Sequence, residues 1–279
     1  MSMVARRGIA NALAYALALV IVAFAAFPIV WALLTSLKPE SDIITARMNY
    51  LPRTITFDNY VAIWERSNFP TLLLNSAITT AMTVAMCLVA GTLGAYAFSR
   101  CRFAGRRELM LGYLLVRMFP AVMIIIPLFI LMRGVGLLDS RFGLALAYTA
   151  LLLPVFVWIM KGFFDGVPAD LEDAARIDGA SRVGALVRVV LPVVIGGLVA
   201  TSVFVAIGAW NEFLFALMLT TSTGSRTWPV GLQLMVGEFQ LPWGTLSAGG
   251  IISIAPVVVL FALVQRALVG GLTAGAVKG

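Results

Sequence analysis

Residues 161–192 read KGFFDGVPADLEDAARIDGASRVGALVRVVLP and separate two long apolar stretches. A simple connection between two packed helices needs only a few residues, so a charged segment of this length indicates structure of its own. Pro168 is typical of a helix boundary and Gly179 of a helix end, and Leu191-Pro192 turns the chain into the next apolar stretch. The pattern predicts two short helices at the membrane surface, which is the layout of a docking element.

The first of these short helices has an acidic start and one face of small side chains. We expect Asp170 to cap its N-terminus and Glu172 to pair with Arg176 one turn later. The side chains expected on one face are those of Leu171, Ala174, Ala175 and Asp178. The small alanines would let another protein approach this face closely. Ser181 is expected to cap the second helix.

The composition is that of a membrane protein. Of the 279 residues 61% are hydrophobic, and the mean hydropathy is +0.99, whereas soluble domains contain roughly 45–50% apolar residues. The net charge is +7, and most of the basic residues lie between the apolar stretches. Basic residues in such positions set the orientation of a membrane protein and do not indicate nucleic-acid binding. The chain has no histidine, the commonest metal ligand. Its two cysteines, Cys87 and Cys101, fall within or at the end of one apolar stretch, so neither a structural disulfide nor a metal site is predicted.

Apolar stretches predict an all-α integral membrane protein with a single transmembrane domain over residues 1–279. Backbone groups in lipid must satisfy one another, so the spans are expected to be helices. The six predicted spans are 11–36, 71–99, 108–133, 142–164, 190–219 and 246–269. Arg6 and Arg7 precede the first span as in a signal peptide, but that apolar run is too long for one, so we expect it to be retained.

The basic residues predict that both termini are cytoplasmic. With the N-terminus inside, twelve of the 20 Lys and Arg residues fall on the cytoplasmic side and seven outside. The longest outer loops are then 37–70 and 220–245, and the segment 161–192 is cytoplasmic. Prolines that should disturb the spans are Pro28, Pro120, Pro127, Pro154 and Pro256. They are either packing kinks or features of helices that line a cavity.

A spaced motif in residues 173–192 resembles the EAA loop of ABC importer permeases. Asp173-Ala174-Ala175 is followed after three residues by Gly179, and after nine more by Val189-x-Leu191-Pro192. The family has Glu where this chain has Asp173, and Ile where it has Val189. The resemblance implies a type I ABC importer permease fold with cytoplasmic coupling helices. It assigns ATPase coupling within residues 165–192 to Glu172, Asp173, Ala174, Ala175, Arg176, Asp178, Gly179, Leu191 and Pro192.

A second resemblance covers most of the chain and is to the maltose-type carbohydrate permeases, in particular their smaller six-span subunit. The matching stretches are Met118-Phe119-Pro120, AWNEF at 209–213, TWPVGL at 227–232 and the tail GLTAGAVKG at 271–279. It implies an ATP-driven importer that works by alternating access. The implied partners are a homologous second permease, two ATP-binding subunits and an extracytoplasmic solute-binding protein.

The sequence contains no phosphate-binding loop of the kind that holds ATP in ATPases. Its lysines, Lys38, Lys161 and Lys278, are not followed by Ser or Thr, so there is no G-x-x-x-x-G-K-[ST] motif. We therefore expect a transport subunit and not an enzyme, with no cofactor in this chain and with ATP and Mg on the partner subunits. The resemblance implies a location in the bacterial cytoplasmic (inner) membrane.

The remaining candidate residues are assigned by resemblance and by position. Glu212 and Arg117 are charges expected within spans, where a charge calls for a role. The substrate-path candidates are Phe119, Trp210, Asn211 and Glu212, and Arg117 is expected to pair with a neighbouring helix or the partner permease. The candidates for contact with the binding protein are Trp228, Phe239 and Trp243. The tail 271–279 is expected to extend between the ATPases.

Three other functions stay open on the sequence alone. The solute is a carbohydrate in the favoured interpretation, but a phosphorylated polyol or another non-sugar solute is an alternative within the same class. An ion-coupled secondary transporter would need no ATPase-docking loop and would more often show inverted repeats. A membrane-embedded enzyme would need catalytic groups, and the chain has no histidine to offer. A requirement for ATP would separate the two ATP-driven importers, for a carbohydrate or for a non-sugar solute, from the secondary transporter and the membrane-embedded enzyme.

Overall fold

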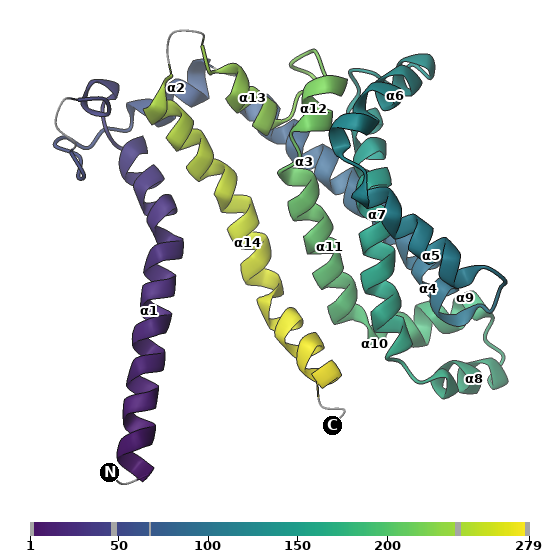
Figure 1. Ribbon diagram of the computed structural model, residues 1–279. Coiled ribbons are helices and arrows are strands. Elements are labelled where there is room, and N and C mark those ends of the chain that lie inside the picture. Colours follow the sequence, from purple (N-terminus) through teal and green to yellow (C-terminus); the bar gives the residue numbers. More distant parts are fainter. Residues whose placement is uncertain (1–2, 46–48, 67, 238–240, 277–279) are drawn as a thin grey trace. The chain divides into compact units, whose positions relative to one another are not determined.

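The computed structural model describes residues 3–45, 49–66, 68–237 and 241–276, and every regular element among them is a helix (Figure 1), which confirms the all-α prediction. In chain order the elements are α1 (Met3–Ser36), η1 (Glu40–Asp42), α2 (Asp58–Arg66), α3 (Phe69–Met86), η2 (Cys87–Gly91), α4 (Thr92–Arg100), α5 (Arg106–Leu115), η3 (Val116–Met118), α6 (Ala121–Gly134), α7 (Arg141–Asp165), α8 (Ala169–Ile177), α9 (Arg182–Ala185), η4 (Leu186–Val190), α10 (Leu191–Val193), α11 (Ile195–Trp210), α12 (Leu214–Leu219), α13 (Trp228–Leu234) and α14 (Trp243–Ala276).

The chain forms two compact units. The first comprises residues up to Phe69 together with Leu232–Ala255, and the second comprises Pro70–Gly231 together with the residues from Pro256 onward. The single transmembrane domain expected for 1–279 stays a prediction.

Among the described residues, four helices are long and apolar enough to cross a membrane. They are Asn11–Ser36, Phe69–Arg100, Arg141–Asp165 and Trp243–Ala262, and they coincide with the predicted spans 11–36, 71–99, 142–164 and the first part of 246–269. Pro28, Pro127, Pro154 and Pro256 lie inside helices, as expected.

The predicted spans 108–133 and 190–219 each correspond to a bent pair of helices. Arg106–Met118 and Ala121–Gly134 meet at 98°. Pro120, at the break, has no N–H and keeps the preceding Phe119 extended, with φ −70° and ψ 132°.

The second pair, Arg182–Val193 and Ile195–Trp210, meets at 83° just after Leu191-Pro192. The predicted span 190–219 also ends early, since α11 stops at Trp210 and α12 is separate. Counting each bent pair as one span gives up to six spans in the described chain.

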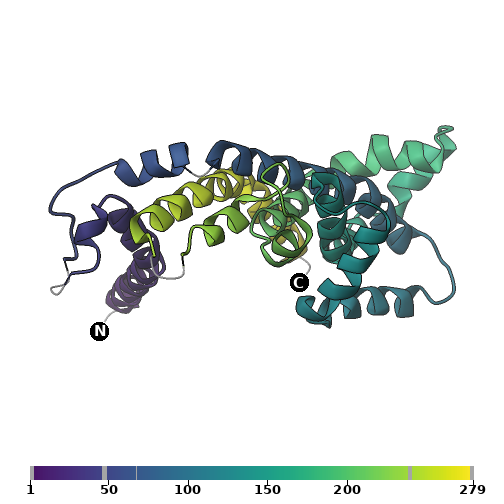
Figure 2. The ribbon, with the colours of Figure 1, turned by 90° about the horizontal axis from the view of Figure 1, so that it is seen from above.

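The second unit is built around α7. This helix packs against both α4 and α11 (Figures 1 and 2). Its Tyr148, Phe156 and Phe164 side chains are fully buried. A Cβ atom at Gly91 would collide with the Phe156 ring, so the glycine permits the close approach of η2 to α7. This packed centre is the support for the α8–α9 segment, which projects at the edge of the unit in Figure 2.

The first unit ties its loop to the start of α14. The Asn59 amide donates hydrogen bonds to the carbonyls of Ser36 (2.9 Å) and Lys38 (2.8 Å), at the end of α1. The Glu40 carboxylate accepts from the backbone N–H groups of Trp243 (2.8 Å) and Gly244 (3.0 Å). An acid at this position satisfies N–H groups that a helix start leaves free. The described parts of the predicted outer loop 37–70 therefore include residues bonded to the ends of α1 and α14.

Candidate functional site

The segment 165–192, called here the coupling segment, contains the two short helices that the sequence predicts. The first, α8, follows Pro168 and has no side-chain cap, so the prediction that Asp170 caps it is wrong; Asp170 lies inside the first turn. Gly179 ends the helix as predicted, with φ +89°. Its N–H donates to the Arg176 carbonyl (3.1 Å), and the next N–H donates to the Ala175 carbonyl (3.0 Å), which closes the helix end.

Glu172 is buried and does not pair with Arg176, so that predicted pair is wrong. Its carboxylate accepts a hydrogen bond from the Tyr96 hydroxyl (2.8 Å) and forms an ion pair with the Arg100 guanidinium. Arg100 also donates to the carbonyl of Val167 at 2.8 Å. The i,i+4 rule considers only Arg176, one turn away in sequence, whereas in the folded chain Tyr96 and Arg100 of α4 lie close enough to donate to Glu172. Charge-assisted bonds of this kind are the strong ones, so Glu172 tethers α8 to α4.

A second contact joins the same end of α4 to α7. The Ser99 hydroxyl donates to the Asp165 carboxylate (2.6 Å), and Lys161 pairs with that carboxylate from one turn earlier on α7. The end of α4 thus holds the chain both before and after the turn that leads into α8. The coupling segment is fixed to the spans by side-chain bonds at both points.

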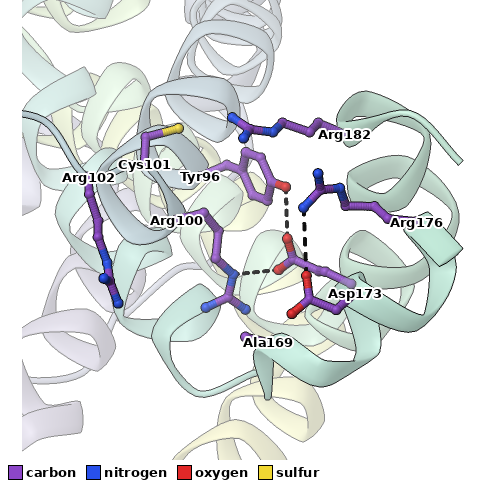
Figure 3. A pocket seen from close by; sticks show the side chains of 9 residues that line it. Tyr96, Arg100, Cys101, Arg102, Ala169, Asp173, Arg176 and Arg182 are labelled. Atoms are coloured by element: carbon purple, nitrogen blue, oxygen red, sulfur yellow. Dashed lines mark hydrogen bonds and ion pairs between the residues drawn. The ribbon is translucent and has the colours of Figure 1, made fainter.

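The two sides of α8 differ in what they face. Successive residues turn by about 100°, which places Ala169, Glu172, Asp173 and Arg176 on one side, called here the inner face, toward the end of α4 (Figure 3). The opposite side, called here the outer face, consists of Leu171, Ala174, Ile177 and Asp178, and all four are exposed. Ile177, which the sequence reading passed over, has 86% of its surface exposed. An exposed isoleucine beside an exposed alanine suits the approach of another protein.

A cavity of about 460 Å³ lies between the end of α4 and the inner face of α8. Four arginines line it, Arg100, Arg102, Arg176 and Arg182, together with the carboxylates of Glu172 and Asp173 (Figure 3). Asp173 lies 3.7 Å from Arg176 in an exposed pair. Asp173, the residue at the acidic position of the EAA motif, therefore lies on the inner face.

The second half of the coupling segment leads into the span. The Ser181 hydroxyl accepts from the Gly184 N–H at 3.1 Å and caps α9, which confirms that prediction. Leu186 and Val190 are buried while Val187 is exposed, so only part of the expected apolar stripe packs inward. Leu191-Pro192 lies directly before the 83° bend, where the chain turns into α11.

The substrate-path candidates have different surroundings. Trp210 is buried at the end of α11, whereas Asn211 and Phe119 are exposed. The Glu212 carboxylate accepts from the N–H groups of Phe215 (2.9 Å) and Ala216 (3.2 Å). Glu212 thus caps the start of α12, a role that accounts for its charge without a substrate. Contact of the four residues with substrate stays a prediction.

Arg117 is expected to pair either with a neighbouring helix or with the partner permease, and it has a partner on a neighbouring helix. Its guanidinium donates to the Leu151 carbonyl of α7 at 3.1 Å. Leu151 lies three residues before Pro154, in the turn where the proline ring weakens the helix's own hydrogen bonds. The contact therefore gives the Arg117 guanidinium an acceptor on α7.

The outer-loop candidates divide into three cases. Trp228 is fully buried, so the prediction that it contacts a binding protein through its ring is wrong; the ring fills the interior where the loop returns to the helices. Trp243 is 43% exposed at the start of α14 and is open to contact. Phe239 lies outside the described residues.

Asp139, which the sequence reading missed, anchors the start of the loop 220–245 that is predicted to be the last outer loop. Its carboxylate accepts from the N–H groups of Thr221 (2.8 Å) and Ser222 (2.9 Å) and from the Ser225 hydroxyl. Burial disfavours the charged form, but these hydrogen bonds outweigh it and lower the pKa of Asp139 below its usual range. The Asn75 amide adds bonds to carbonyls of the same loop. No short-range pattern signals a clamp between residues so distant in sequence.

Helix α14 continues to Ala276, so residues 271–276 of the tail are helical, and their place between the ATPases stays a prediction. The last three residues of the predicted tail, 277–279, lie outside the described residues. In the described part of the chain, no group of three or more Cys, Asp or Glu residues is placed to hold a metal ion.

Comparisons with known proteins agree on one family. Residues 88–273 match the model of the family described as binding-protein-dependent transport system inner membrane component. The chain is 38% identical to the sulfoquinovosyl glycerol transport system permease protein SmoH of Agrobacterium fabrum, over 91% of this chain and 89% of that protein. It is also 38% identical to the trehalose transport system permease protein SugB of Mycobacterium tuberculosis, over 93% and 94%.

A solved structure agrees with the fold. A chain of a bacterial ABC transporter involved in the import of the acidic polysaccharide alginate superposes with a TM-score of 0.79 and 27% identity, over 95% of this chain and 98% of that one. Taken with the family match over the coupling segment, this protein belongs to the binding-protein-dependent transport system inner membrane components, the permease subunits of ABC transporters.

Proposed function

We propose that this chain is the permease subunit of an importer that carries a carbohydrate across the inner membrane, driven by ATP that separate subunits hydrolyse. The supporting observation is the construction of α8. Its outer face is exposed and partly apolar, while its inner face is bonded to α4 through Glu172. A helix that is fixed on one side and open on the other is suited to receive a partner and pass its movement on.

The proposed coupling follows from these bonds. An ATPase seated on the outer face moves α8 when ATP binding closes the ATPase pair. Because Glu172 and Arg100 join α8 to the end of the span Phe69–Arg100, that span moves with α8. ATP then biases the permease between an inward-open and an outward-open state. In this arrangement α8 is cytoplasmic, and so are both termini.

The carbohydrate assignment rests on the relatives, whose names specify trehalose and sulfoquinovosyl glycerol transport, and on the alginate importer with the same fold. The other proposed partners are a homologous second permease, two ATP-binding subunits and an extracytoplasmic solute-binding protein. In the proposal Trp243 contributes to the surface that meets the binding protein. Phe119 and Asn211, both exposed, are the proposed contacts along the solute path.

The test is ATP-dependent uptake by the reconstituted transporter, with Ile177→Ser as the docking variant. Burying an isoleucine is worth about 1.5–3 kcal/mol, so its loss should weaken retention of the ATPase by roughly 10- to 140-fold and lower uptake in parallel. The matched control is Leu109→Ser, which alters an exposed apolar residue on α5.

Uptake of radiolabelled sugars into vesicles loaded with ATP, and none without it, is the expected result for the wild type. Uptake that proceeds without ATP would replace the proposal with a secondary transporter. Import of a phosphorylated polyol in preference to every sugar tested would keep the ATP-driven mechanism and overturn the carbohydrate assignment. Equal retention of the ATPase by Ile177→Ser and Leu109→Ser would show that the ATPase does not dock on Ile177.

A further inference from the structure

We propose that the arginine-lined cavity between α4 and α8 binds the phosphate of an anionic phospholipid headgroup in the cytoplasmic leaflet. The proposal rests on the proposed function in one respect, since the cytoplasmic side is set by ATPase docking at α8. The site takes a phosphate diester or monoester, and the lipid is the source that its position favours.

The cavity has more positive charge than its own carboxylates can balance. Arg100 is engaged by Glu172, and Arg176 is loosely paired with Asp173. Within the described residues, no carboxylate oxygen lies within 4.0 Å of Arg102 or Arg182. Two guanidinium groups therefore line a cavity of about 460 Å³ without an acidic partner. That volume is ample for a phosphate group and its glycerol.

The chemistry of the unpaired groups selects phosphate. A guanidinium presents several N–H donors in a planar fork, and that fork matches two phosphate oxygens at once. The arginines come from three places in the fold, since Arg102 follows α4, Arg176 is on α8 and Arg182 begins α9 (Figure 3). One bound phosphate would thus join the end of a span to both short helices of the coupling segment.

The position of the cavity favours a lipid over a soluble phosphate. Arg100 is the last residue of the candidate span Phe69–Arg100, so the adjoining cavity lies at the end of a membrane helix. The following sequence, RCRFAGRR at 100–107, is a basic cluster directly beyond a span, the usual signature of attraction to anionic lipid. Phe103, 43% exposed, lies in this cluster. Arg102 also lines a second hollow with Phe103 and Arg106, which extends the basic surface along the membrane.

The proposed lipid and the ATPase do not compete for one surface. The cavity is on the inner face of α8, which carries Glu172 and Arg176, whereas the outer face carries Ala174 and Ile177. The lipid is therefore a resident of the assembled transporter. It would neutralise Arg102 and Arg182 and hold the coupling segment against the span.

The experiment is a native mass spectrometry titration of the intact transporter, with all its subunits, using short-chain phosphatidylglycerol, phosphatidylcholine of the same chain length and inorganic phosphate. The variant is Arg102→Gln with Arg182→Gln, which leaves the bonds of Glu172 untouched. A charge-matched control, Arg133→Gln with Arg141→Gln, removes two arginines remote from the cavity. A third variant, Arg102→Lys with Arg182→Lys, keeps the charge and removes the forks.

Wild type and control are expected to bind phosphatidylglycerol at least about tenfold more tightly than phosphatidylcholine. The double glutamine variant should lose this preference. The double lysine variant should keep part of it. Inorganic phosphate that displaces the lipid at equal concentration would keep the phosphate site and overturn its lipid source. An unchanged preference in the double glutamine variant would overturn the site itself. Co-purification of the ATPase is read in every sample, and its absence from the wild type would instead indicate failure of the proposed function.

Discussion

Replacing Glu172 with alanine should release α8 from α4 while leaving the outer face of α8 chemically unchanged. The Glu172 side chain is only 9% exposed and that of Arg100 only 18%. The change removes the acceptor for Tyr96 and the ion partner of Arg100. A hydrogen bond to a charged group contributes roughly 1.5–3 kcal/mol, and breaking a buried pair costs about 3–5 kcal/mol. Because Arg100 keeps its bond to the Val167 carbonyl and some access to water, we expect a cost of about 2–4 kcal/mol.

Hydrogen exchange measures this cost directly. If the tether limits local opening of α8, a loss of about 2–4 kcal/mol accelerates exchange of the 169–179 amides by roughly 30- to 700-fold. The sample is the assembled transporter in nanodiscs without nucleotide. The control is Asp173→Ala, which removes an exposed pair worth about 0–1 kcal/mol and should change exchange only a few fold. Exchange in the Glu172 variant that matches the control would refute the tether.

Three further results are expected. Asp139→Asn should cost about 1–2 kcal/mol at neutral pH and loosen the last outer loop, measured as faster proteolysis there. Since the folded-state pKa of Asp139 is lowered, its stabilisation is present above about pH 4 and is lost as the pH falls below that value; loosening of the wild-type loop that begins at neutral pH would contradict this. Gly179→Ala should cost about 1–2 kcal/mol of stability because φ is +89°, which strains an alanine although no atom obstructs the added Cβ. Gly162→Ala, equally unobstructed but inside α7, is the control and should stabilise its helix by about 0.5–1 kcal/mol; equal exchange in the two would refute the backbone argument. Trp228→Ala should cost about 3–5 kcal/mol of stability by leaving a cavity; normal stability with lost binding-protein affinity would show the ring to be a contact residue instead.

Features that depend on neighbouring residues could be predicted from the sequence. The four continuous spans follow from long apolar runs, and the end of α8 at Gly179 follows from the ease with which glycine adopts positive φ. Ser181 caps α9 because its hydroxyl reaches an N–H within the same turn. Each of these outcomes is decided within a few residues of the chain.

Features that depend on distant partners could not be predicted in this way. Glu172 has a partner one turn away in sequence, but it bonds to Tyr96 and Arg100, which only the packing of α4 beside α8 supplies. The same holds for Asp139, whose partners lie beyond a whole span. Proline positions indicated where helices would be disturbed, but neither their number nor their spacing gives the 98° bend at Pro120.

The aromatic residues of the outer loop show why residue type alone misleads. A tryptophan in an outer loop suits a partner surface or a membrane interface equally well. Trp228 does neither with its ring, because the loop folds back: the backbone N–H of Trp228 donates to the Ser76 hydroxyl on α3 at 2.8 Å, and the ring is buried. Burial of that ring is a consequence of tertiary packing, which the local sequence does not encode.

The most direct test of the account is photo-cross-linking from position 177 in the intact transporter, with the same photoreactive residue at position 109 as the comparison. Ile177 is the most exposed large apolar residue of α8, so the account predicts a cross-link from position 177 to an ATP-binding subunit and none from position 109. A cross-link from position 177 to lipid alone, with the ATPase captured from neither position, would contradict the claim that the outer face of α8 receives the ATPase.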